Sequence, residues 1–432
     1  MTSAKSTNSH LAESSPAQEV GPNELRALTA WAFEELRDVP GGIRDMHLGI
    51  AQRAFRGVGP AARPIQRIHN AVSRGVYGAI AAGTTGVGQI ADKALEAERV
   101  GNGTVLSSTH AGGALIGVLN GLRGDSLERS QSALHQPVSV RVNGGTVRAD
   151  ADSLRSAFPN ASGRIVVFIH GLMGTEFNWD WGSERDAAGP SGGYGVRLAS
   201  ELGYTPVYLR YNSGRHISEN GRSVAALLDE LTRAWPVEVR SVALIGHSMG
   251  GLVARSACHY GSQSARLWPG RVNTVVSLGT PHLGAPLEQA THLSSAVLSA
   301  LPETRMFGSL LRRRSSGIRD LRHGSLVDED WRGHDPDALR AAACAEVPLL
   351  EGATHCFVSA SITGSPRHPL GRLLGDTLVL VPSASGEGRK RRIPFEDEHG
   401  LHVGGAHHLA LLNHPEVYER LRKWLGPDGH LA

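Results

Sequence analysis

From residue 137 onward, short apolar runs alternate with amphipathic stretches. The apolar runs lie at 165–169, 206–211, 242–245, 272–278 and 356–362. Stretches with apolar residues at helical spacing separate them, at 195–202, 219–235 and 251–260. Strands that are apolar on both faces and are separated by helices are typical of parallel sheets covered on both sides. The pattern therefore predicts an α/β fold with a mostly parallel central sheet.

The pattern indicates a β-hairpin just before this alternation. Val138, Val140 and Val142 alternate with polar residues, and the sequence Asn-Gly-Gly follows at 143–145. Asn-Gly favours the tight turns that join antiparallel strands. We also expect a short helix at 150–158 and a final amphipathic helix that begins near residue 414.

The first 130 residues contain no strand pattern. Residues 1–20 are polar and are expected to form a disordered tail, and residues 21–130 are expected to form a helical segment. Its amphipathic stretches lie at 24–38, 43–55 and 65–80. Such a helical surface either packs on the following domain or touches lipid. Few basic residues lie on its polar face, which favours packing, and peripheral membrane contact stays open as the alternative.

Residues 136–432 are expected to form one α/β catalytic domain that carries an insertion. The insertion, at about 287–350, interrupts the alternation and contains a basic run at 312–314 and an acidic run at 328–330. An insertion after a strand, above the carboxyl edge of a sheet, is where lids lie. The alternative is a set of extra helices fixed to the sheet, and the sequence favours neither.

Composition and charge exclude several classes of protein. The chain has 432 residues, is 40% hydrophobic and carries a net charge of +3. The apolar fraction is large enough for a core, and the charge balance argues against a nucleic-acid-binding protein. The chain begins without the apolar segment of a signal peptide, and no uninterrupted apolar run is long enough to span a membrane. Since there are only 3 cysteines, without Cys-x-x-Cys spacing, we expect a cytoplasmic protein.

A candidate nucleophile follows the apolar run at 242–245. The sequence Gly-His-Ser-Met-Gly at 246–250 places Ser248 between that run and a helical stretch. A serine on a sharp turn between a strand and a helix is the nucleophile elbow of serine hydrolases. A second Gly-x-Ser-x-Gly match, at 189–193, has no strand before Ser191 and is expected to be a loop. We therefore expect Ser248 to be the catalytic nucleophile.

A serine nucleophile needs a base and an acid that orients the base. Most carboxylates after Ser248 lie in charged runs, whereas Asp376 stands alone in a turn before the apolar run at 378–381, which indicates a loop at the end of a strand. We expect Asp376 to be the acid. His408, on a loop before a helix, is favoured as the base over His407.

The same histidine cluster could hold zinc, because histidine is a common zinc ligand. The cluster comprises His399, His402, His407, His408 and His414. No cysteine and no paired His–Glu spacing accompanies these histidines, so we expect no metal and no cofactor.

The negative charge that develops on a substrate carbonyl needs fixed hydrogen-bond donors. The backbone N–H of Met249 is one candidate donor, because it directly follows the nucleophile. An apolar run also ends in His-Gly-Leu-Met-Gly at 170–174, and the N–H of Leu172 is the second candidate. We expect His170 to shape this turn rather than act as a base.

Four motifs in this order resemble those of the α/β-hydrolase superfamily. They are His-Gly-Leu-Met-Gly at 170–174, Gly-His-Ser-Met-Gly-Gly at 246–251, Leu-Gly-Thr-Pro-His-Leu-Gly-Ala-Pro at 278–286 and His-Leu at 408–409. Over about residues 138–425 the chain is most similar to bacterial lipases and esterases and to the GPI inositol-deacylase-like (PGAP1-like) group. The resemblance implies an α/β-hydrolase fold. It also implies a triad of Ser248, His408 and Asp376, with Leu172 and Met249 as oxyanion-hole donors.

Together these features predict a serine ester hydrolase of the lipase or esterase type. Its expected substrates are lipid-like or other apolar acyl esters, cleaved through an acyl-enzyme without a cofactor. An acyltransferase with the same triad is one alternative, since an alcohol can replace water in the second step. A catalytically inactive binding module with the same fold is the other.

Overall fold

The computed structural model describes residues 105–183, 192–264, 266–285, 315–335, 344–365, 375–388 and 391–426, together with residues 24, 27, 368 and 371. The predicted disordered tail and the amphipathic stretches at 43–55 and 65–80 lie outside the described residues, as does most of the stretch at 24–38. Ser191, the serine of the second motif match, also lies outside them.

The described part of the chain forms one sheet of eight strands in the order β2-β1-β4-β3-β5-β6-β7-β8. The strands are β1 (Ser139–Val142), β2 (Gly145–Val147), β3 (Arg164–Ile169), β4 (Thr205–Arg210), β5 (Ser241–His247), β6 (Val272–Leu278), β7 (Thr354–Ser361) and β8 (Gly400–Gly404). Strand β1 pairs antiparallel with β2 and with β4, and the other five pairings are parallel. The predicted mostly parallel α/β sheet and the predicted hairpin are confirmed.

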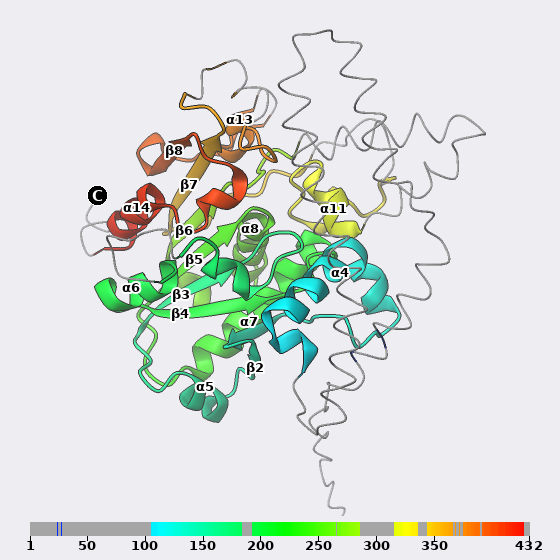
Figure 1. Ribbon diagram of the computed structural model, residues 1–432, viewed down its shortest axis with the longest axis vertical. Coiled ribbons are helices and arrows are strands. Elements are labelled where there is room, and N and C mark those ends of the chain that lie inside the picture. Colours follow the sequence, from blue (N-terminus) through cyan, green and yellow to red (C-terminus); the bar gives the residue numbers. More distant parts are fainter. Residues whose placement is uncertain are drawn as a thin grey trace, which may run out of the picture.

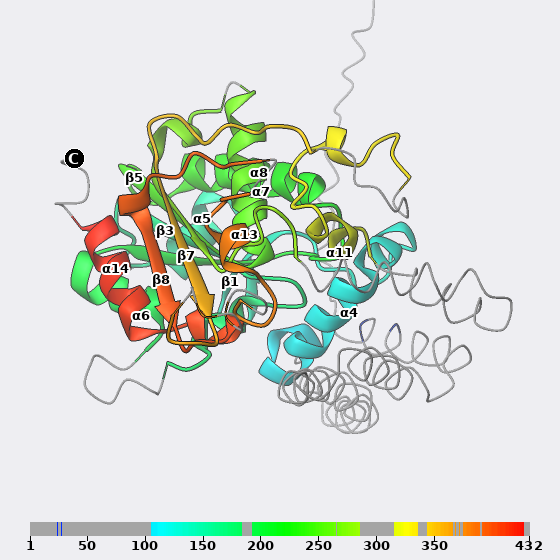
Figure 2. The same ribbon diagram turned by 90° about the horizontal axis from the view of Figure 1, so that it is seen from above.

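Helices cover both faces of this sheet (Figures 1 and 2). The α-helices are α4 (His110–Arg129), α5 (Ala151–Ala157), α6 (Tyr194–Leu202), α7 (Ile217–Ala234), α8 (Met249–Ser262), α11 (Ser316–Leu321), α13 (Val381–Ala384) and α14 (Pro415–Leu425). Short 3-10 helices are η2 (Leu106–Ser108), η3 (Glu176–Asp180), η4 (Trp268–Arg271), η5 (Asp328–Asp330), η6 (Asp397–His399) and η7 (His408–Leu411). The helices expected at 150–158, 195–202, 219–235, 251–260 and from 414 are all present.

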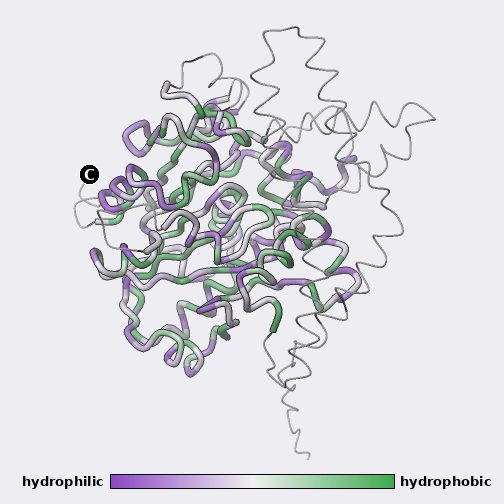
Figure 3. The backbone as a smooth tube through the Cα atoms, in the orientation of Figure 1, coloured by the Kyte–Doolittle hydropathy of each residue, from purple (hydrophilic) through white to green (hydrophobic). Residues whose placement is uncertain are grey.

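Alternate side chains of the central strands enter two separate cores. Val167 and Leu244 are buried in one core together with residues of α7 and α8. The adjacent residues Phe168 and Ile245 are buried in the other core, with residues of α6 and α14. Because successive side chains of a strand point to opposite faces, a run in which every residue is apolar is buried on both sides. Figure 3 shows these hydrophobic stretches along the central strands.

Two details of the sequence prediction are corrected by the structure. The apolar run at 378–381, from which Asp376 was expected to lie at the end of a strand, is not itself a strand. Val381 begins the short helix α13. Strand β8 was not predicted, although it pairs parallel with β7 and completes the sheet. Its residues, Gly-Leu-His-Val-Gly, include only two apolar side chains between glycines, so the pattern gives no strand signal.

The described part of the insertion is bonded to the body of the domain. Asp320 of α11 is buried and accepts a hydrogen bond from the backbone N–H of Ile217 at 2.8 Å. Ser316 donates to Asp125 of α4 at 3.2 Å, and α4 lies beside α11 in both views of the molecule (Figures 1 and 2). The rest of the insertion, to which the expected lid belongs, lies outside the described residues.

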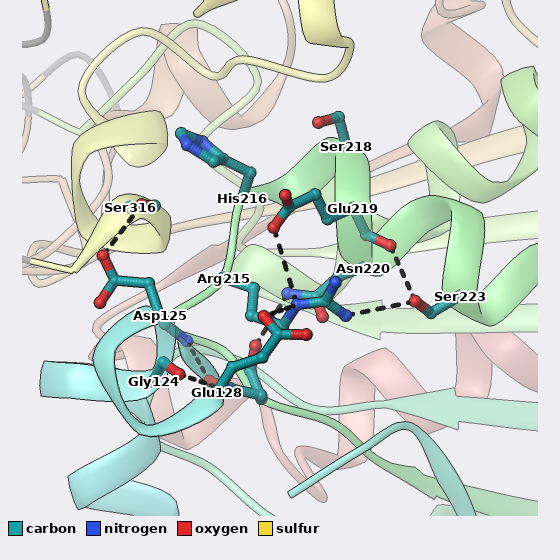
Figure 4. A network of polar contacts seen from close by, with 12 residues as sticks. Gly124, Asp125, Glu128, Arg215, His216, Ser218, Glu219, Asn220, Ser223 and Ser316 are labelled. Carbon is teal, nitrogen blue, oxygen red and sulfur yellow. Dashed lines mark hydrogen bonds and ion pairs between the residues drawn. The ribbon is translucent and has the colours of Figure 1, made fainter. Parts of the chain in front are cut away.

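A polar network joins α4 to the start of α7 (Figure 4). The guanidinium of Arg215 forms ion pairs with Glu128 of α4 at 2.6 Å and with Glu219 of α7 at 3.6 Å. Arg215 is also within hydrogen-bond distance of Ser223, at 3.3 Å. The last part of the helical N-terminal segment is therefore attached to the sheet domain through charged side chains.

A buried ion pair adds a second attachment. Arg210, at the end of β4, bonds through Nε to the Glu176 carboxylate at 2.6 Å and through Nη1 to the carbonyl oxygen of Ser107 at 2.6 Å. The side chains are 1% and 7% exposed. This pair links η2, which precedes α4, to the segment after the turn at 170–174.

Replacing Glu176 with glutamine is expected to lower the free energy of unfolding by about 3 kcal/mol, because it removes the carboxylate that forms the buried ion pair with Arg210. Urea denaturation followed by circular dichroism measures this loss. The exposed pair of Glu419 and Arg422, at 2.9 Å, offers the matched control. Glu419→Gln should change stability by less than about 1 kcal/mol. Equal losses in the two variants would contradict a role for burial.

Among the described residues, no helix combines the length and the apolar character needed to cross a membrane.

Candidate active site

Ser248 lies on a sharp turn between β5 and α8. Its backbone has φ of 55° and ψ of −123°, a strained conformation for a residue other than glycine. The turn is possible only because its neighbours are small: a Cβ on Gly246 would overlap the backbone of Gly250, and one on Gly250 would overlap the carbonyl oxygen of Ile169. The predicted strand, turn and helix around Ser248 are therefore confirmed. The hydroxyl of Ser248 makes no hydrogen bond to any described residue, and the side chain is only partly buried.

The structure brings Asp376 and His408 into direct contact. His408 Nδ1 lies 2.7 Å from Asp376 Oδ2, and the backbone N–H of His408 donates to the carbonyl oxygen of Asp376 at 2.9 Å. Both side chains are buried, at 1% exposure for Asp376 and 3% for His408. An aspartate bonded to Nδ1 places the proton on that nitrogen and leaves Nε2 as the basic atom. His408 Nε2 is buried and has no partner among the described residues.

The loop around Asp376 holds the carboxylate in place. Asp376 Oδ1 accepts hydrogen bonds from the backbone N–H groups of Leu378 at 3.0 Å and Val379 at 2.8 Å. The carbonyl oxygen of Gly375 accepts from Ile362, which directly follows β7, at 2.9 Å. The chain therefore leaves β7 and returns to its carboxyl end before Asp376. One carboxylate oxygen accepts hydrogen bonds from the loop, and the other is hydrogen-bonded to His408.

The loop that carries His408 lies against the turn of Ser248. The backbone N–H of Ser248 donates to Leu278 at 2.8 Å, and a Cβ on the next residue, Gly279, would lie 3.2 Å from His408 Nδ1 and Cε1. On the other side, His247 Nε2 lies 3.3 Å from the carbonyl oxygen of His408. Ser248, His408 and Asp376 thus gather at the carboxyl ends of β5, β6 and β7.

His407 does not share this environment. Its side chain is exposed, and the residue precedes η7, in which His408 is the first residue. Glu396, Glu398 and His399 form the one described group whose ligand atoms lie close enough to hold a metal ion, and His408 is not part of it. These three residues are exposed or partly exposed, and no second feature indicates that they bind a ligand.

The turn at 170–174, which follows β3, packs directly against the turn of Ser248. A Cβ on Gly171 would lie 3.0 Å from Ser248 Cβ, so the absence of a side chain allows the two turns to meet. The N–H groups of Leu172 and Met249 donate no hydrogen bond to another described residue. The two predicted donors thus lie in turns that touch each other, and each retains an available proton.

His170 is held as a neutral structural side chain. Its Nδ1 lies 2.8 Å from the carbonyl oxygen of Gly171, and its Nε2 accepts from the N–H of Tyr211 at 3.2 Å. Burial lowers the pKa of His170 to about 3. These contacts agree with the expectation that His170 shapes the turn by hydrogen bonding.

His247 lies against His408, a contact that the sequence reasoning did not identify. Burial, followed by the adjacent His408, lowers the pKa of His247 to about 3. Its ring lies 4.8 Å from the ring of His408 between centroids. The His247 imidazole beside His408 is therefore neutral and adds no positive charge there. Its one signal in the sequence is its position directly before Ser248.

Part of the chain is similar to a described protein family. The model of the PGAP1-like alpha/beta domain matches residues 208–332, which is less than a third of the 432 residues. The match confirms the resemblance to the PGAP1-like group for this part, which includes α7, β5, α8 and β6. No curated protein matches the chain in sequence.

Solved structures similar to this chain include hydrolases from three organisms. The mature form of a Bacillus licheniformis lipase has 19% identity and a TM-score of 0.39, covering 60% of this chain and 91% of its own. A Pyrococcus furiosus esterase has 16% identity and a TM-score of 0.33, with 62% and 84% covered. An alpha/beta hydrolase fold protein from Chitinophaga pinensis has 14% identity and a TM-score of 0.35, with 62% and 90% covered.

Proposed function

We propose that the protein is a serine ester hydrolase in which Ser248, His408 and Asp376 act together. The observation that carries the proposal is the buried hydrogen bond between His408 Nδ1 and Asp376, beside a serine in the strained conformation of a nucleophile elbow. An isolated buried aspartate–histidine pair has structural explanations. A strained serine, a basic Nε2 without a partner and two available N–H donors next to the pair together support catalysis.

The proposed reaction begins with proton transfer from Ser248 Oγ to His408 Nε2. The serine oxygen then attacks the carbonyl carbon of the ester, and the electron pair of the C=O bond moves to the oxygen. The N–H groups of Leu172 and Met249 stabilise this oxyanion. His408 returns the proton to the leaving alcohol as the C–O bond breaks, and an acyl-enzyme remains.

Water completes the cycle by the same route. His408 Nε2 accepts a proton from water, the hydroxyl attacks the acyl-enzyme, and the proton returns to Ser248 as the carboxylic acid leaves. Asp376 stays ionised throughout and stabilises the imidazolium. Ser248 and His408 form no hydrogen bond in the structure. This is consistent with the scheme, because catalytic hydrogen bonds are often long or poorly aligned in enzymes without substrate.

The proposed substrates are lipid-like or other apolar acyl esters, as the resemblance to lipases and esterases implies. A fluorophosphonate probe tests the reaction class, because it phosphonylates an activated serine. We expect labelling of Ser248, located by peptide mass spectrometry, and hydrolysis within a panel of p-nitrophenyl esters of increasing acyl length. If neither labelling nor hydrolysis occurs with the folded protein, the chain is a binding module rather than an enzyme.

Replacing Asp376 with asparagine is expected to lower kcat by roughly ten-thousandfold, since an amide cannot hold the proton of His408 on Nδ1. The variant keeps the size of the side chain, so circular dichroism should show an unchanged fold. Asp397, an exposed acid of a charged run, is the matched control, and Asp397→Asn should leave kcat unchanged. A kcat within tenfold of the original for Asp376→Asn would assign the acid elsewhere.

A further inference from the structure

The turn that carries Leu172 is held from outside by the loop that follows β4. Met173 has φ of 60°, the left-handed conformation that residues other than glycine rarely adopt. Its backbone N–H donates to Ser213 Oγ at 3.0 Å. Ser213 is 1% exposed, so water cannot replace this acceptor. The hydroxyl therefore fixes the peptide group between Leu172 and Met173.

Helix α4 packs against the same turn from another side. A Cβ on Gly121 would lie 3.0 Å from the backbone N and Cα of Met173 and would overlap its side chain. A Cβ on Gly117 would lie 3.0 Å from the carbonyl oxygens of Met173 and Gly174. The helix thus contacts the backbone of the turn itself, which leaves the turn little room to rotate.

The loop of Ser213 is itself anchored to the helices around it. Asn212 Nδ2 donates to the carbonyl oxygen of Gly124 in α4 at 2.8 Å, and Asn220 of α7 donates to the carbonyl oxygen of Asn212 at 2.8 Å. The N–H of Gly317 in α11 donates to Gly214 at 3.0 Å. Ser213 lies between residues that are bonded to three different helices, so its hydroxyl has a fixed position.

We propose that Ser213 is a positioning residue of the oxyanion hole. Its hydroxyl holds the peptide group next to the one that carries the Leu172 N–H, and so aims that N–H at the developing oxyanion. Donors for an oxyanion act by being fixed before the reaction, and a misplacement of about 1 Å can lower the rate about a hundredfold. This role rests on the proposed function, since it presupposes an oxyanion at Ser248.

Ser213→Ala tests the role, because it removes the acceptor and leaves the N–H of Met173 buried without a partner. We expect kcat to fall about 10- to 100-fold with KM nearly unchanged. The affinity for an alkylboronic acid, which forms a tetrahedral anion on the catalytic serine, should fall in parallel. Ser213→Thr, which keeps the hydroxyl, should restore both values at least in part.

Ser256→Ala is the matched control. Ser256 is 0% exposed, and its hydroxyl donates to the carbonyl oxygen of Leu326 at 2.6 Å, so this variant also loses one buried hydrogen bond. We expect a similar decrease in Tm, without a change in kcat or in boronate affinity. Gly121→Ala provides a second variant, which should lower kcat and boronate affinity by pushing Met173.

The outcomes separate the two proposals. If the unmodified protein hydrolyses esters while Ser213→Ala and Gly121→Ala keep its kcat and its boronate affinity, the positioning role is wrong and the proposed function stands. If Ser213→Ala loses activity only in proportion to the unfolded fraction, as Ser256→Ala would, the role is structural. If the unmodified protein neither hydrolyses esters nor reacts with the fluorophosphonate, both proposals fail.

Discussion

Replacing Ser248 with alanine is expected to lower kcat for ester hydrolysis by roughly a millionfold, because the members of a triad act as one unit. In the proposed mechanism, Ser248 Oγ is the only protein atom that forms a covalent bond to the acyl group. Alanine also fits the turn, since the backbone at φ of 55° already accommodates a Cβ at this position. The loss should therefore be chemical rather than structural.

The measurement is kcat for the best ester of the panel, determined with purified protein whose unfolding transition matches that of the original. Ser383→Ala is a suitable control: Ser383 is buried, and its hydroxyl donates to the carbonyl oxygen of Gly284 at 2.7 Å. That control should retain activity. Hydrolysis by Ser248→Ala at more than about a hundredth of the original rate would remove Ser248 from the mechanism.

The second large effect is expected at His408. His408→Ala should lower kcat by about a millionfold as well, because neither proton transfer of the proposed cycle can occur without the imidazole. The adjacent His407 supplies an unusually close control, since it is the same residue type one position earlier. His407 is exposed and lacks the contact with Asp376, so His407→Ala should retain more than half of the original kcat.

Parallel assays of His407→Ala and His408→Ala show which of the two histidines is the base. A larger loss for His407→Ala than for His408→Ala would contradict the assignment of the base. Fluorophosphonate labelling gives an independent measurement, because the rate of labelling depends on activation of Ser248 by its base. We expect slow labelling of His408→Ala and normal labelling of His407→Ala.

Local sequence predicts the parts of the site that depend on neighbouring residues. The turn of Ser248 follows from an apolar run, small residues on both sides and a helical stretch, all within about 15 residues. The turn at 170–174 is predicted in the same way from the run before it. The strands β3, β4, β5, β6 and β7 were predicted because each is apolar on both faces. Strand β8 was missed because it lies at the edge of the sheet, where few of its side chains need to be apolar.

Other parts of the site depend on long-range contacts. Asp376 was selected as a lone acid in a turn, but the strand expected beside it is absent, and the residue returns to the end of β7 through the bond between Ile362 and Gly375. The contact of His247 with His408 and the proposed role of Ser213 are not specified by local sequence, because each depends on a partner that is distant in the chain.

The sequence by itself determined the α/β fold and the turns at Ser248 and Leu172, because alternation, strand length and glycine spacing act within one or two elements. The sequence favoured His408 over His407, but only the tertiary structure decided which histidine meets Asp376, because the two adjacent residues differ in which side chain enters the core. The tertiary structure also decided that α4 packs on the turn at 170–174. That contact depends on two backbones approaching each other closely, and no local pattern specifies the partner.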